Sequence, residues 1–233
     1  MVLTIRALDG EPRLAHGFST LALGSMRRGA DDPSPGTSAR RAFVQELGLD
    51  PDRLTVAGAV HGADVARVDV PSAAVEGVDA LVTARAGIPL LATFADCYPI
   101  LLWDPELPAL ALVHAGWRGT EAGVAPAAVR ALAREYGSEP RKLVAGIGPG
   151  ICGDCYEVGE EVADRFDPEI VRPSPGGRYL LDLAAANVRA LLAAGLCRDR
   201  IHMLGVCTME SPDLPSHRRS PDGNRFACLA AIR

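Results

Sequence analysis

The sequence lacks the segments that mark membrane and secreted proteins. No stretch of its 233 residues approaches the roughly 18 consecutive apolar residues of a membrane-spanning helix. Residues 1–10 include Arg6 and Asp9 and no long apolar core of the kind that secretory signals carry. We therefore expect a cytoplasmic protein that has no membrane partner.

The sequence also lacks a basic patch. Lys142 is its only lysine, and its 24 lysines and arginines stand against 29 acidic residues, for a net charge of −5. No basic run has aromatic residues interleaved with it, and aromatic residues make up only 5% of the chain. The charge balance therefore gives no electrostatic reason to expect a nucleic-acid partner or binding to an anionic membrane surface.

The cysteines do not suggest a disulfide framework. In a chain of this length without a secretory signal, thiols that stay reduced, bind metal or act in catalysis are more common than disulfides. The six cysteines are Cys97, Cys152, Cys155, Cys197, Cys207 and Cys228. Cys152 and Cys155 form a Cys-x-x-Cys pair, but a structural zinc site would need a second pair, which Cys207 and Cys228 do not form in sequence. We interpret Cys152 and Cys155 as two reduced thiols around a turn.

Strand-like and helix-like segments alternate along the chain. Short apolar runs predict strands, most of them buried on both faces, at residues 13–20, 54–60, 65–68, 79–83, 90–94, 100–103, 110–113, 143–147, 201–206 and 226–232. Apolar residues at helical spacing predict helices at residues 38–47, 120–136, 158–166 and 183–194. Residues 24–37, rich in Gly, Pro, Asp and Ser, predict a loop. We expect residues 1–233 to form a single α/β domain with a mixed β-sheet flanked by helices.

Three side chains that can bind a metal stand at the ends of predicted strands. His61 follows one strand, Cys97 precedes another, and His114 ends a third. A catalytic zinc site takes three protein ligands of these types and keeps its fourth position for water or substrate. The separations of 36 and 17 residues (97 − 61 and 114 − 97) match no local zinc-finger pattern, so spacing alone does not bring the three together. Asp96 is the predicted partner of a ligating histidine.

The same residues also suit a cysteine hydrolase that uses no metal. Cys97 would be its nucleophile and His114 its base, and the backbone amides of Gly116 and Gly119 would face an oxyanion. A lone cysteine or histidine is more often a structural residue than a ligand. From the residues alone, the zinc and cysteine-hydrolase hypotheses have about equal support.

Two adjacent arginines near the C-terminus are candidates for anion binding. Arg218 and Arg219 follow Ser216 and His217 in a proline-rich segment. Guanidinium groups bind phosphate or a polar substrate group bidentately. The alternative for this segment is a solvated basic turn.

Several short motifs occur together in one order. They are Val60-His61-Gly62, Ala95-Asp96-Cys97, Val113-His114-Ala115-Gly116-Trp117-Arg118-Gly119, Gly148-Pro149, Tyr156-Glu157-Val158-Gly159, Cys207-Thr208 and Ser216-His217-Arg218-Arg219. In this combination the chain resembles the laccase-domain family, also called the YfiH-like or purine nucleoside phosphorylase family. The resemblance extends from about residue 14 to the C-terminus.

The resemblance implies a single domain with a YfiH-like, cysteine-hydrolase-type α/β fold and a zinc site on His61, Cys97 and His114. Cys97 and His114 would also be the catalytic residues, and copper is the alternative metal. The implied activities are phosphorolysis of adenosine, inosine and methylthioadenosine, deamination of adenosine, and copper-dependent oxidation of phenolic compounds. Purine nucleosides and phosphate would be the partners. The implied substrate-binding residues are Arg118, Arg218 and Arg219.

Histidine is too scarce for a multicopper oxidase. Copper centres are built largely from imidazoles, and the chain has five histidines, which are His16, His61, His114, His202 and His217. One mononuclear site is feasible, and zinc in it has no redox chemistry of its own. The chain departs from the family pattern at Ala59, where glutamine is frequent, and at Leu214 and Pro215, where aromatic residues are usual. We therefore predict a zinc-dependent purine nucleoside enzyme whose substrate preference these positions affect.

Overall fold

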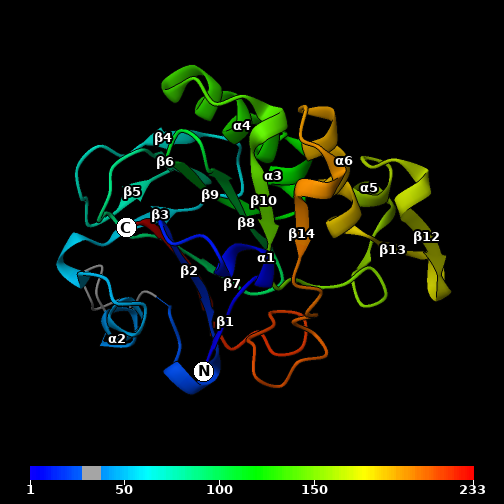
Figure 1. Cartoon of the computed structure of the whole chain (residues 1–233). Coiled ribbons are helices and arrows are strands. Elements are labelled where there is room, and N and C mark those ends of the chain that lie inside the picture. Colours follow the sequence, from blue (N-terminus) through cyan, green and yellow to red (C-terminus); the bar gives the residue numbers. More distant parts are fainter. Residues whose placement is uncertain (28–37) are drawn as a thin grey trace.

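Two six-stranded β-sheets form the centre of the computed structural model, which describes residues 1–27 and 38–233 (Figure 1). In order across it, the first sheet contains β1 (Val2–Leu3), β2 (Leu14–Ser19), β15 (Phe226–Ile232), β7 (Leu90–Phe94), β3 (Thr55–Gly58) and β5 (Val75–Glu76). The second contains β14 (Ile201–Met203), β10 (Val144–Ile147), β8 (Tyr98–Asp104), β9 (Ala109–Ala115), β6 (Ala80–Thr83) and β4 (Val65–Arg67). Both sheets mix parallel and antiparallel pairs. The sequence predicted mixed pairing, but it did not show that the strands divide into two sheets.

The inner position of strands β8 and β9 explains why their sequences are apolar on both faces. Every residue of these two antiparallel neighbours is buried. Leu101 and Leu112 pack into the core between the two sheets, whereas Ile100 and Val113 pack into the core beneath the helices. Alternate side chains of a strand point to opposite faces, so a strand in this inner position needs an apolar residue at almost every position.

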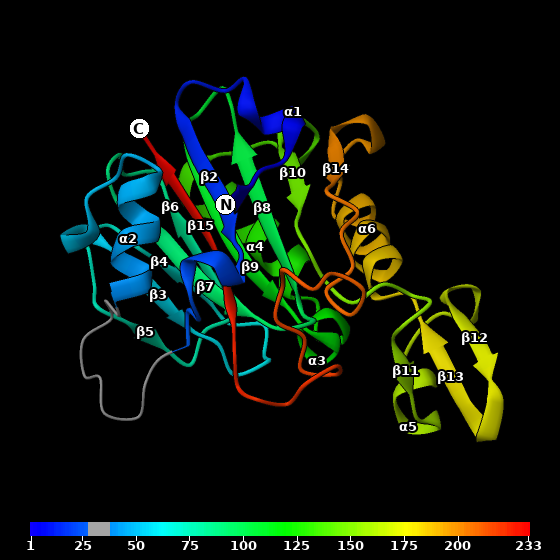
Figure 2. The same ribbon diagram turned by 90° about the horizontal axis from the view of Figure 1, so that it is seen from below.

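Helices cover the outer faces of both sheets (Figures 1 and 2). Phe43 and Val44 of α2 (Ser38–Glu46) pack with Leu91 and Leu229 on the outer face of the first sheet. Residues of α4 (Val124–Tyr136) and α6 (Leu183–Ala193) pack on the outer face of the second sheet. The remaining α-helices are α1 (Arg6–Asp9), α3 (Trp117–Glu121) and α5 (Glu160–Ala163). Short 3₁₀ turns occupy Leu21–Leu23, Pro51–Arg53, Pro140–Lys142, Pro168–Ile170, Pro175–Gly177 and Arg198–Arg200.

The predicted helix at residues 120–136 is two helices. Gly123 lies between α3 and α4 with φ = 79°, a left-handed conformation that interrupts a right-handed helix. The first of the two helices begins at Trp117, before the predicted start at Thr120. The Thr120 side chain exchanges hydrogen bonds with the amide side chain of Asn187 on α6. Gly123 therefore changes the direction of the chain between α3 and α4.

The helix predicted at residues 158–166 is present only over the four residues of α5, next to which lies a small third sheet. It contains β11 (Glu157–Val158), β13 (Arg178–Leu181) and β12 (Val171–Ser174), and Figure 2 shows it with α5 to one side of the larger sheets. The backbone of β11 pairs with Leu180 and Tyr179, and Gly159 stays extended before α5 begins. The helix begins later than predicted because the pairing of Glu157 and Val158 with a strand about 20 residues downstream overrides local helical spacing there.

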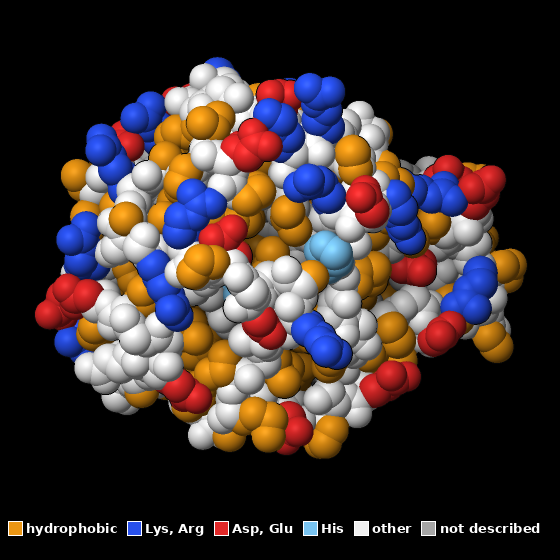
Figure 3. Space-filling view, in the orientation of Figure 1, with side chains coloured by type: hydrophobic (Ala, Val, Ile, Leu, Met, Phe, Trp, Pro, Cys, Tyr) orange, Lys and Arg blue, Asp and Glu red, His pale blue; other side chains and the backbone are white. Residues whose placement is uncertain are grey.

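Charged side chains and the lengths of the helices are the two structural features that bear on a nucleic-acid or membrane partner. Basic and acidic side chains are interspersed on the face that Figure 3 shows. Among the described residues, no helix has both the length and the apolar character needed to cross a membrane. Residues 28–37 of the predicted loop lie outside the described residues.

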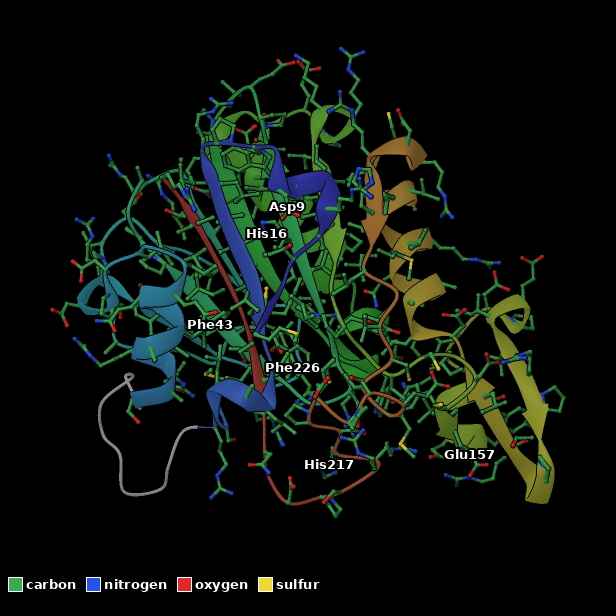
Figure 4. The ribbon with its side chains drawn as sticks, turned by 60° about the horizontal axis from the view of Figure 1, so that its bottom comes forward. Asp9, His16, Phe43, Glu157, His217 and Phe226 are labelled. Atoms are coloured by element: carbon green, nitrogen blue, oxygen red, sulfur yellow. The ribbon has the colours of Figure 1, made fainter. Side chains whose placement is uncertain are left out.

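A buried histidine of β2 binds the backbone of Ile5, at the start of α1 (Figure 4). His16 is only 5% exposed, and its Nε2 accepts a hydrogen bond of 2.9 Å from the amide of Ile5. Burial lowers the pKa of His16 below its ordinary 6.5, although the Asp9 carboxylate, 3.7 Å away, opposes this shift. The native state therefore favours neutral imidazole, whose Nε2 lone pair is available to the amide.

We predict that this histidine makes unfolding pH-dependent. Because its pKa is lower in the folded than in the unfolded state, its contribution is complete above pH 6.5 and is lost as the pH falls towards the folded pKa. The free energy of unfolding, measured with urea, should fall between about pH 7.5 and about pH 5.5. This fall should be smaller in His16→Gln than in the wild type. His202→Gln, at a partly exposed position, is the control. Equal losses in His16→Gln and wild type would contradict the assignment.

Candidate metal centre

The three predicted metal ligands meet where the two large sheets adjoin. Cys97 immediately precedes β8, and the pairing of Pro99 with His114 places this cysteine beside the end of β9. His61 lies beyond β3, which belongs to the other sheet. One ligand atom from each of His61, Cys97 and His114 lies within 4.8 Å of the others. Strand pairing and sheet packing thus produce the convergence that sequence spacing could not show.

A buried carboxylate holds both histidines in place. Asp79, immediately before β6, is fully buried, and its Oδ1 lies 2.9 Å from Nδ1 of His114. The same oxygen accepts the amide of His61 at 2.9 Å. Its other oxygen accepts the amides of Gly62 at 2.7 Å and Val60 at 3.1 Å. The carboxylate therefore favours a proton on Nδ1 of His114, which leaves Nε2 as the nitrogen for a metal.

The expectation that Asp96 orients a histidine was wrong. The Asp96 carboxylate accepts hydrogen bonds from the Thr208 hydroxyl at 2.7 Å and from the Arg218 amide at 2.8 Å. Asp79 fills the predicted role instead. The sequence offered no signal for this, since Asp79 is an ordinary aspartate before an apolar run and its partners lie 17 to 35 residues away.

The electrostatic surroundings favour a thiolate at Cys97. Burial alone would raise its pKa, but the hydrogen bonds and positive charge of His114 and His61 outweigh burial and lower it to about 6. Burial alone would lower the pKa of His114, but its contacts with Asp79 and Cys97 raise it to about 9. One thiolate and two imidazoles, one of them oriented by a carboxylate, make a suitable donor set for zinc with an open fourth position.

A glycine supplies the space for this centre. A Cβ atom at Gly116 would lie 2.8 Å from Sγ of Cys97 and 3.0 Å from Cδ2 of His61, closer than side chains pack. The same crowding applies at Gly119, where a Cβ atom would lie 2.9 Å from the carbonyl oxygen of Gly62. The glycines predicted as oxyanion donors therefore have a packing role: they let the turn after β9 approach the ligands.

The three ligands line a cavity of about 940 Å³ that has several arginines in its wall. Two of them, Arg118 and Arg218, are among the substrate-binding residues that the family resemblance implies. The Arg118 guanidinium lies over the Trp117 ring at 4.3 Å, and that of Arg218 lies over the Tyr156 ring at 5.0 Å. The other cavity-lining arginines are Arg27, Arg40 and Arg225. Positive charge near a metal centre suits an anionic substrate.

Arg218 and His217 belong to residues 204–225, the segment between β14 and β15, which we call the C-terminal segment. Arg218 donates to the carbonyl oxygen of Glu157 on β11 at 2.6 Å. Figure 4 shows Glu157 and His217 at the same end of the molecule. The small sheet and the C-terminal segment together therefore hold Arg218 at the cavity.

The contacts of Arg219 differ from those of its neighbour. Its guanidinium donates to the carbonyl oxygens of four residues in the C-terminal segment: Thr208, Met209, Ser211 and Leu214. These bonds give Arg219 a structural role in the shape of the segment. Its predicted part in substrate binding stays a prediction.

Comparison with known proteins extends these observations. The model of a protein family described as "Multi-copper polyphenol oxidoreductase laccase" matches residues 14–233. This chain belongs to that family. A purine nucleoside phosphorylase of Streptomyces coelicolor is 44% identical over 202 residues, which are 84% of this chain and 82% of the relative. Adenosine deaminase RL5, from an unknown prokaryotic organism, is 38% identical over 182 residues, 71% of this chain and 69% of the relative.

A solved structure of the family has the same fold. The crystal structure of the hypothetical protein YfiH of Bacillus licheniformis superposes with a TM-score of 0.86 at 25% identity and covers 97% of this chain and 98% of its own. The predicted laccase-domain membership and the single-domain α/β fold with mixed sheets are therefore confirmed.

We predict that Asp79→Asn weakens zinc binding at this centre by about 10- to 100-fold. The amide side chain of asparagine cannot accept hydrogen bonds from the His114 ring and all three backbone amides. Zinc protects a ligating thiolate from alkylation. The zinc concentration that protects Cys97 by half from iodoacetamide, measured by peptide mass spectrometry, should rise accordingly. Asp104→Asn is the matched control, since Asp104 is also buried and accepts two backbone amides at the far end of β8. Unchanged protection in Asp79→Asn would show that the carboxylate does not support the centre.

Proposed function

We propose that this chain is a zinc-dependent purine nucleoside enzyme, with phosphorolysis of adenosine, inosine or methylthioadenosine as its main activity and adenosine deamination as a second one. The observation that carries the proposal is the placement of His61, Cys97 and His114 in the wall of an arginine-lined cavity. The relatives named purine nucleoside phosphorylase and adenosine deaminase support the substrate class. A cytoplasmic location stays a prediction.

The chain's own residues would prepare the reacting groups. His61, Cys97 and His114 would hold the zinc, which supplies a Lewis acid that polarises a substrate oxygen. Asp79 keeps the His114 ring in one orientation and fixes the backbone turn that carries His61. Because these bonds exist before substrate arrives, the centre requires little reorganisation during the reaction.

Phosphorolysis needs a bound phosphate, which deamination does not. In phosphorolysis a phosphate oxygen forms a bond to C1′ of the ribose as the bond from C1′ to the purine nitrogen breaks. Deamination instead adds water at C6 of the purine and releases the C6 amino group as ammonia. Arg118 and Arg218 are the proposed phosphate ligands, because guanidinium groups match phosphate oxygens bidentately and both line the cavity. This arginine pair favours phosphorolysis as the main activity.

The test is phosphate-dependent release of the purine base from the three nucleosides. Cys97→Ser and His114→Ala should each lower kcat/KM by at least about 100-fold through loss of the centre. Arg218→Ala should raise the KM for phosphate by about tenfold or more through loss of a charge-assisted hydrogen bond. Arg189→Ala, which removes an exposed arginine paired with Asp167 and Glu169, is the control. Full phosphorolysis by both Cys97→Ser and His114→Ala would overturn the proposal.

One observation favours a second candidate, a metal-free cysteine hydrolase. The contacts between Asp79 and His114 and between His114 and Cys97 follow the order of a catalytic triad. The two functions predict opposite behaviour of the Cys97 thiol. As purified, the zinc enzyme should resist alkylation by iodoacetamide at Cys97 until a chelator is added, whereas the hydrolase thiolate should react at once. Cys197, which is exposed, is the internal control for alkylation in the same digest.

Metal analysis of the same preparation tests the copper-dependent polyphenol oxidase alternative. All five histidines lie within the described residues, and only His61 and His114 belong to a group of candidate metal ligands there. Copper bound in place of zinc, together with oxidation of a phenol, would favour the oxidase. Bound zinc without oxidation would favour the nucleoside enzyme.

A further inference from the structure

Three cysteines and a glutamate meet in a second cluster outside the centre described above. One ligand atom from each of Cys152, Cys155, Cys207 and Glu210 lies within 4.8 Å of the others. The sequence predicts that Cys152 and Cys155 are two reduced thiols around a turn, and the structure has both as free cysteines joined by a turn. The sequence did not show that Cys207, 55 residues from Cys152, lies against the same turn.

Backbone pairing brings these distant residues together. Gly150 and Cys207 form an isolated parallel bridge, in which Gly150 donates to Val206 and accepts from Thr208. The turn itself closes through a hydrogen bond from the Cys155 amide to the Cys152 carbonyl. The cluster therefore does not depend on flexible side chains alone, since two backbone segments are joined beneath it.

The spacing of the donor atoms suits a tetrahedral zinc ion. Zinc lies about 2.3 Å from sulfur and about 2.0 Å from carboxylate oxygen, so sulfur and oxygen ligands of one ion are about 3.5 Å apart. Sγ of Cys155 lies 3.6 Å from Oε1 of Glu210. Two sulfur ligands are about 3.8 Å apart in such a site, and the upper limit of 4.8 Å in the cluster requires a contraction of about an ångström at most.

One of the three thiols, Cys207, also has the surroundings of a thiolate ligand. Sγ of Cys207 accepts a hydrogen bond of 3.3 Å from the amide of Cys152, and a negatively charged sulfur is the better acceptor. Cys207 is buried and the Cys152 and Cys155 side chains are half-buried, whereas Glu210 is exposed. A metal ion can therefore reach the cluster from solvent on the side of Glu210.

We propose that Cys152, Cys155, Cys207 and Glu210 form a second, structural zinc site. Three thiolates and one carboxylate complete a closed four-ligand set, which distinguishes it from the open three-ligand centre of His61, Cys97 and His114. The two sites share no residue, so this inference is independent of the proposed nucleoside activity.

Such a site would brace one wall of the cavity. It would join the turn between β10 and β11 to the C-terminal segment. Thr208, next to Cys207, donates its hydroxyl to Asp96, which also accepts the amide of Arg218. A metal cross-link at this point would hold the backbone that positions Arg218 without contacting substrate.

Zinc content per chain, measured after dialysis without chelator, tests the proposal. Cys97→Ser should still hold about one zinc, and adding Cys155→Ser to it should remove that zinc. Cys197→Ser, a change at an exposed cysteine outside both groups, should leave the zinc content of the wild type unchanged. If the three-ligand centre binds no metal, the wild type should hold about one zinc that Cys155→Ser removes and Cys97→Ser does not. Failure of one site is thus distinguishable from failure of the other.

A milder variant distinguishes loss of zinc binding from loss of folding. Glu210→Gln changes an exposed side chain and should weaken zinc binding in the Cys97→Ser background by about tenfold or more. Cobalt(II) substituted for zinc in that background should give the charge-transfer absorption of several thiolates, which Cys155→Ser should largely remove. Cys97→Ser protein without zinc or cobalt bound, or with a disulfide between Cys152 and Cys155 as purified, would overturn the proposal.

Discussion

The buried carboxylate of Asp79 is the interaction on which the candidate centre depends. Burial would raise the pKa of this carboxyl, but hydrogen bonds from His114 and from the amides of Gly62 and Val60 lower it below its usual value. The carboxylate stays charged inside the protein because His114 and three backbone amides donate hydrogen bonds to it. One side chain thereby joins the turn after β3 to the end of β9, and these two elements belong to different sheets.

The position of the centre at the junction of the two sheets explains its combination of rigidity and access. His114 lies on an inner strand and is 4% exposed, whereas His61 lies on an exposed turn with φ = 64°. Such a backbone conformation is uncommon outside glycine and persists where surrounding contacts hold it. Here the contacts are the three amides that Asp79 accepts. The buried side of the site is thus preorganised, while the cavity side stays open to substrate.

Asp96 and Arg219 extend this organisation to the C-terminal segment. Asp96 also has a left-handed backbone, with φ = 84°, and accepts from Thr208 and Arg218. Arg219 donates to the backbone carbonyls of the segment. The adjacent arginines thus differ in their contacts: Arg218 lines the cavity, whereas Arg219 binds backbone carbonyls of the segment that presents it. The proposed second zinc site would act on the same segment from its other end.

The sequence by itself determined the local features of this protein. Continuous apolarity predicted β8 and β9, the helical spacing of apolar residues predicted α2 and α6, and the motifs identified the family together with the residue types of the centre. These features depend on neighbours within a few turns or on a family pattern. The tertiary structure alone decided the division into two sheets, the role of Asp79 and the meeting of Cys207 with Cys152 and Cys155. The physical reason is that strand register and sheet packing set the distances between residues far apart in the chain, and sequence separation does not encode those distances.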